Sequence, residues 1–115
     1  MLAVYPVLNV PAVAAIVGTR IYQDIARPDA VAPYVVWSRL AVVPENNLSN
    51  PPPGDRESIS VDVFAKTEAQ RDALTVAVRN ALEARGHVLT IQSLGQDVDT
   101  QNWRMTLDAD IHSTR

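Results

Sequence analysis

The sequence of 115 residues contains no cysteine, which excludes disulfides and thiolate metal sites. Aromatic residues make up only 5% of the chain, too few for the row of exposed rings on which single-stranded nucleic acid stacks. The nine arginines and one lysine are scattered, and the formal net charge is −3. That sign is wrong for a phosphate-binding surface. The core must therefore consist mainly of Val, Leu, Ile and Ala, and we expect no specific binding of DNA.

Long uninterrupted apolar runs are also lacking. The stretch Met1–Gly18 is apolar, but Pro6, Asn9 and Pro11 interrupt it, and no basic segment precedes it. We expect neither a secretion signal nor a membrane span. Asn9 is a plausible N-cap with Pro11 in the first helical turn, and Val10, Val13, Ala14 and Val17 give a short apolar face. The segment is instead expected to form a short helix or two on a sheet.

Metal and cofactor motifs are missing as well. His87 and His112 lie in different predicted strands without the spacing of a metal site. Asp97 and Asp99 in GQDVDTQN resemble the start of a calcium loop, yet the required glycine and terminal glutamate are absent. The four scattered glycines do not form a phosphate-binding turn. We therefore expect no metal and no cofactor.

Catalytic patterns are equally scarce. No serine stands in GxSxG. Asp108 and Asp110 share one face of a predicted strand and could do acid–base work, although a solvated strand face is the simpler interpretation. Trp37 and Trp103 could line a pocket or anchor the core. The sequence predicts a protein that is not an enzyme, and a small cytoplasmic ligand-binding or enzyme domain stays open as an alternative.

What the chain does contain is a strong strand-and-helix unit in Ser58–Gly86. Ile59, Val61, Val63 and Ala65 alternate with Ser60, Asp62 and Phe64, which is typical of a half-buried strand. Thr67 and Gln70 have the spacing of a capping box. An apolar helical stripe follows, with charged residues opposite and Gly86 as the expected C-terminal stop. The stripe comprises Leu74, Ala77, Val78, Ala81 and Leu82; the opposite face comprises Glu68, Arg71, Asp72, Thr75, Arg79 and Glu83.

Further strands are predicted at residues 19–25, 34–43, 87–94 and 103–111. The polar segment Pro44–Glu57 contains three consecutive prolines and is predicted to project as a loop between two paired strands. The order of elements predicts an α+β fold: one antiparallel sheet of about four to five strands with two helices packed on one face. We expect a single domain over residues 1–115, whose bare sheet face is available to a neighbour.

Three ordered segments resemble the tail-completion and tail-terminator proteins of long-tailed bacteriophages. They are AIVGTRIY at Ala15–Tyr22, PYVVWSR at Pro33–Arg39, and VDVFAKTEAQRDAL at Val61–Leu74. The resemblance implies the fold of the lambda-type tail terminator and a structural virion protein without enzymatic activity. Members of this family form a ring, typically six-fold, that caps the tail tube, ends its polymerisation and joins the tail to the head connector.

The resemblance further implies a homo-oligomer that contacts the tail tube protein and the head–tail connector or stopper, while DNA passes through the lumen. The protein would reside in the virion neck after assembly in the host cytoplasm. A head-side connector or stopper is the alternative within this class. Polarity and loop position suggest a set of contact residues: Arg39, Glu45, Asn46, Asn47, Leu48, Asp55, Arg56, Asp97, Asp99 and Arg104.

Overall fold

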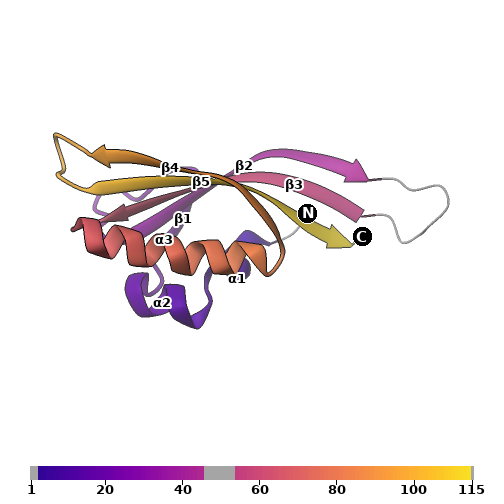
Figure 1. Ribbon diagram of the computed structural model, residues 1–115, viewed down its shortest axis with the longest axis horizontal. Helices are drawn as coiled ribbons and strands as arrows, with labels where there is room; N and C mark the ends of the chain where they lie inside the picture. The colour runs from indigo at the N-terminus through magenta and orange to yellow at the C-terminus, as the bar shows by residue number, and fades with distance from the viewer. Residues whose placement is uncertain (1–2, 46–53, 115) are drawn as a thin grey trace.

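The computed structural model describes residues 3–45 and 54–114 and contains one five-stranded sheet with helices on one face (Figure 1). The elements follow the order α1 Val4–Leu8, α2 Pro11–Val17, β1 Ile21–Gln23, β2 Tyr34–Glu45, β3 Gly54–Ala65, α3 Glu68–Glu83, β4 Gly86–Gln96 and β5 Trp103–Thr114. The predicted α+β class is confirmed. Two details differ, since the described chain has three helices and the sheet is mixed.

The sheet has the strand order β1-β2-β3-β5-β4. Long antiparallel ladders join β2 to β3, β3 to β5, and β5 to β4. The short β1 instead runs parallel to β2, pairing Ile21–Gln23 with Val35–Trp37. The expectation of a purely antiparallel sheet was wrong at this edge, because the connection between the two strands is long enough to return the chain in the same direction.

The core lies between the sheet and the helices. The predicted inward residues of β3 are all fully buried, and so is the stripe of α3 at Leu74, Val78 and Leu82. They meet Leu107, Ala109 and Ile111 of β5 and the apolar side chains of α1 and α2. Trp37 is 6% exposed and belongs to this core, so of its two predicted roles the structure shows the core anchor.

The start of α3 matches its prediction, but its end does not. Thr67 is the N-cap, and its hydroxyl accepts a hydrogen bond from the Gln70 amide at 3.1 Å. The Gln70 side chain accepts from the Lys66 amide rather than from that of Thr67. The C-cap is Ala84, and Gly86 is already the first residue of β4. Gly86 therefore does not act as a helix stop. It is required in the strand, because a Cβ atom at this position would overlap the Asp110 carbonyl oxygen of β5.

Near the N-terminus the helices are offset from their expected bounds. Helix α1 includes Pro6, because a proline in the first turn lacks only an N–H that would have no helical partner. Helix α2 starts at Pro11, and its N-cap is Val10 instead of Asn9. Gly18 ends α2 with a φ of 62°, a conformation that glycine adopts without strain.

The predicted loop Pro44–Glu57 is shorter in the structure at both ends. Strand β2 continues to Glu45 and β3 begins at Gly54, with Pro44 opposite Asp55 and Glu45 opposite Gly54. Residues 46–53 lie outside the described part of the chain. The two strands thus extend beyond the region that the helices cover (Figure 1).

Candidate assembly surface

Most of the predicted contact residues fall at two opposite ends of the molecule. Glu45, Asp55 and Arg56 lie at the paired ends of β2 and β3, and Arg39 lies midway along β2. Asp97, Asp99 and Arg104 lie at or beside the β4–β5 turn, at the opposite end of the sheet (Figure 1). Asn46, Asn47 and Leu48 are outside the described residues. The structure therefore does not gather these residues into one site.

Arg39 and Glu57 form an ion pair beneath β2. Arg39 Nε lies 2.9 Å from Glu57 Oε1, at ion-pair distance but without the angles of a directed hydrogen bond. The Glu57 side chain is fully buried and that of Arg39 is 20% exposed. Asp55, two residues before Glu57 on the same face of β3, is also buried. This pair anchors the far half of β2, which the sequence alone did not indicate.

The helix-free face of the sheet carries polar side chains along β3 and β5. The Ser58 hydroxyl donates to Asp110 Oδ1 at 2.9 Å, and Arg56 Nε lies 4.0 Å from Asp110 Oδ2. The Thr90 hydroxyl donates to Asp108 Oδ2 at 3.4 Å. The two aspartates thus have different partners, which favours a structural role on the sheet face over an acid–base pair.

An aromatic cluster stands on the same face near the β4–β5 turn. Tyr34 and Phe64 stack with their centroids 4.6 Å apart, Tyr22 meets Tyr34 edge-on, and the Arg104 guanidinium lies 4.9 Å from the Phe64 centroid. Burial raises the pKa of the Tyr34 phenol above its usual value, and nearby Arg104 partly opposes that rise. Arg104 therefore already contacts an aromatic surface of its own chain.

Asp97 stabilises the β4–β5 turn. Its carboxylate accepts from the Asp99 amide at 2.8 Å and from the Thr100 amide at 3.4 Å. Among the residues that the structure describes, no group of three or more His, Asp or Glu is placed to hold a metal ion. The rings of His87 and His112 lie 6.2 Å apart and belong to no such group. The contacts of Asp97 with the Asp99 and Thr100 amides therefore give it a local structural role in the turn.

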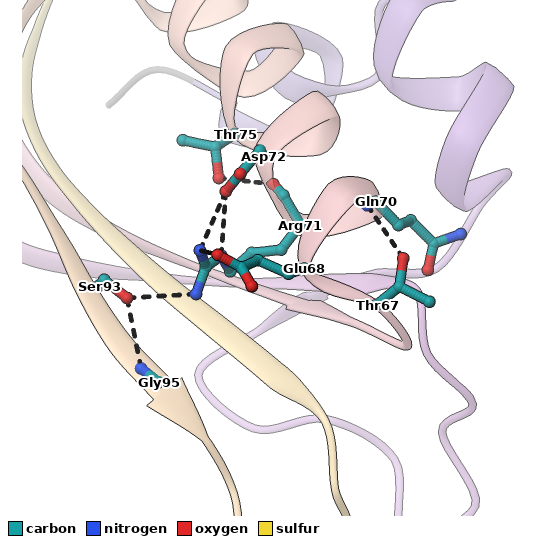
Figure 2. Close-up of polar contacts among 8 residues, drawn as sticks. All are labelled: Thr67, Glu68, Gln70, Arg71, Asp72, Thr75, Ser93 and Gly95. Carbon is teal, nitrogen blue, oxygen red and sulfur yellow. Dashed lines mark hydrogen bonds and ion pairs between the residues drawn. The ribbon is translucent and has the colours of Figure 1, made fainter.

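Arg71 connects α3 to the edge strand β4. The sequence did not predict this contact, because polar residues opposite an apolar stripe are usually solvated. It is only 6% exposed, and its Nη1 donates to the Ser93 hydroxyl at 3.1 Å (Figure 2). Its Nη2 lies 3.1 Å from Asp72 Oδ1 and 3.6 Å from Glu68 Oε1. The guanidinium also lies 5.5 Å from the Trp103 ring centroid. The Ser93 hydroxyl in turn accepts from the Gly95 amide at 3.4 Å, so Arg71 supports an irregular point of β4.

Replacing Arg71 with Met should lower the free energy of unfolding by about 2 kcal/mol, because buried hydrogen bonds from a charged donor are lost. Arg79→Met is the matched control on the same helix, since the Arg79–Glu83 pair is exposed and should contribute less than about 0.5 kcal/mol. Urea denaturation at equal protein concentration measures both values. Equal effects of the two substitutions would show that Arg71 does not anchor β4.

Strand β4 forms one edge of the sheet and is mostly exposed. Its eleven residues, GHVLTIQSLGQ, include no Asp, Glu, Lys or Arg. Leu89, Ile91 and Leu94 are exposed on it. Edge strands usually carry charges or other features that prevent pairing with a further chain. This edge is therefore suited to contact another protein.

The chain is similar to one protein family and to a chain of a solved structure. The family model described as "Tail completion protein gp17" matches residues 3–112. A chain of a solved structure titled "Virion of native gene transfer agent (GTA) particle" superposes with a TM-score of 0.66 at 24% identity, covering 98% of this chain and 92% of that one. Curated proteins give no match. No helix in residues 3–45 and 54–114 is long and apolar enough to cross a membrane. Because the family model covers nearly the whole sequence, the chain belongs to the bacteriophage tail completion protein gp17 family.

Proposed function

We propose that six copies of this chain form a ring that caps the phage tail tube, ends its polymerisation and presents a surface to the head connector. Family membership supports the coarser part, a structural protein of the phage tail. The observation that carries the finer part is the uncharged, unpaired edge of β4, since a closed ring needs an interface that a single subunit leaves unsatisfied.

The charge of the chain suits such a ring. Six copies carry a formal charge of 6 × −3 = −18. A channel with a net negative field repels the phosphate backbone, so DNA could pass without adhering to the wall. The protein would assemble in the host cytoplasm and remain in the neck of the virion.

The first test is the mass of the purified protein in solution. We expect an assembly of 6 × 12.6 kDa, or 75.6 kDa, by light scattering, and rings in electron micrographs. Added to polymerising tail tube protein, it should bind tube ends and stop elongation. A stable monomer at micromolar concentration that binds no tubes would refute the proposal. Binding to connector particles but not to tubes would instead identify a head-side stopper.

A further inference from the structure

Each of the three register shifts in the sheet coincides with an exposed leucine. The shifts fall between Arg39 and Ala41 in β2, and in β4 between Val88 and Thr90 and between Ser93 and Gly95. The residues without a paired partner at these shifts are Leu40, Leu89 and Leu94, and their exposed fractions are 61%, 60% and 44%. A β-bulge re-aims a side chain, and here every one turns a large apolar group into solvent. All three lie on strands that have an open edge.

The two open edges are on opposite sides of the sheet. Among the strands that the structure describes, β4 pairs with β5 alone, which leaves its outer edge open. On the other side β1 pairs with Val35–Trp37 of β2, and among the described residues no strand covers the outer edge of Arg39–Glu45. That segment exposes Leu40 and Val43. One subunit therefore offers two different apolar strand edges, the requirement for a head-to-tail contact.

Beside β4 the surface is hollowed. A shallow hollow of about 250 Å³ is lined by Arg79 of α3 and by Val88, Leu89, Thr90 and Ile91 of β4. Further along the strand, the Arg71–Ser93 hydrogen bond holds the second bulge, next to Leu94. The apolar groups of this edge thus have a supported backbone and an adjacent space that a projecting side chain could fill.

We propose that β4 of one subunit pairs antiparallel with the Arg39–Glu45 segment of β2 in the next copy, burying Leu89 and Leu94 against Leu40 and Val43. The direction follows from the topology. Strands β2 and β5 run one way and β3 and β4 the other, so a copy related by rotation about the ring axis brings β2 antiparallel to β4. This inference deepens the proposed ring and depends on it.

The heights of the two edges set the tilt of the strands in this contact. Strand β4 begins opposite Ile111, whereas the Arg39–Glu45 segment of β2 pairs with Gly54–Ile59, so the two edges lie at different heights along the sheet. Closure then requires strands tilted to the ring axis, as in any barrel.

Disulfide cross-linking tests the contact cleanly because the chain has no native cysteine. Ala41→Cys and Thr90→Cys place thiols on exposed positions of the two edges, and Val43→Cys with Gln92→Cys samples another register. Oxidised alone, each single variant should stay uncross-linked. Mixed β2 and β4 variants should give dimers, and a chain with both substitutions should give a ladder ending at the ring size.

The outcomes separate the interface from the proposed function. Dimers of Thr90→Cys alone would overturn the proposal in favour of a twofold β4–β4 contact. Rings that never cross-link in either register would also overturn it, while the ring function survives. A monomeric protein that binds no tail tube would refute both the interface and the proposed ring function. Cross-linked ladders with unchanged tube capping support both.

A second measurement uses charge on the same edges. Leu40→Lys and Leu89→Lys should each weaken assembly by roughly tenfold or more, because they place a charge at the centre of an apolar contact. The control is Val98→Lys in the β4–β5 turn, where the side chain is 91% exposed. The apparent dissociation constant from sedimentation gives the comparison. An equal effect of Val98→Lys, or no effect at either leucine, would refute the interface.

Discussion

Replacing Gly86 with alanine should destabilise the protein by about 3 kcal/mol or more. A Cβ atom at this position would overlap the Asp110 carbonyl oxygen and lie 2.8 Å from both the Asp110 carbonyl carbon and the Ile111 Cα. These are backbone atoms of β5, a strand in the middle of the sheet, so they cannot move aside as a flexible side chain could. The start of β4 would have to separate from β5, and the Arg85 carbonyl would lose the hydrogen bond from the His112 amide.

The control for this substitution is Gly95→Ala near the other end of β4. Gly95 has a φ of 73°, which costs an alanine about 1 kcal/mol, but nothing lies within 4 Å of an added Cβ. Urea unfolding followed by circular dichroism measures both variants, at one protein concentration because assembly adds to apparent stability. A smaller loss of unfolding free energy for Gly86→Ala than for Gly95→Ala would show that Gly86 does not pack closely against the β5 backbone.

Periodicity predicted the parts of the fold that are buried on one side. Alternation in Ile59–Ala65 and the helical stripe at Leu74–Leu82 each reflect a single boundary between core and solvent, and a boundary of this kind leaves a repeating pattern. The Thr67 cap was predictable for a similar reason, since both partners are local in sequence. All three were confirmed.

Features that depend on contacts between distant residues were not predictable. Arg71 and Glu57 are buried charged residues whose partners include residues on other elements, Ser93 of β4 and Arg39 of β2. Gly86 is required by a carbonyl of β5. The bulges at Leu40 and Leu89 break the alternation of their strands, which makes both faces look apolar. Polarity in the sequence therefore points to contact residues in loops, whereas the interface that we propose uses the apolar strand edges.

Arg39→Met should cost about 3–5 kcal/mol of folding free energy, because it removes the guanidinium that lies 2.9 Å from the fully buried Glu57 carboxylate. Exposed ion pairs contribute far less, so the size of this effect measures the burial of the pair. It also bears on the proposed assembly, since Arg39 directly precedes Leu40 on β2. Equilibrium unfolding gives the stability, and the cross-linking of Ala41→Cys in the same background reports whether the edge keeps its geometry.

Glu57→Leu and the double variant Arg39→Met with Glu57→Leu complete a mutant cycle. A buried charge costs most when its partner alone is removed, so the double variant should be more stable than Arg39→Met by about 2 kcal/mol or more. Arg56→Met serves as the control, because its contact with Asp110 is 4.0 Å long and its side chain is 42% exposed. If Arg39→Met costs no more than Arg56→Met, the pair does not anchor β2. The far half of β2 would then be held by its ladder with β3 and not by the ion pair. In that case Leu40→Lys should weaken assembly equally whether or not Arg39 and Glu57 are replaced.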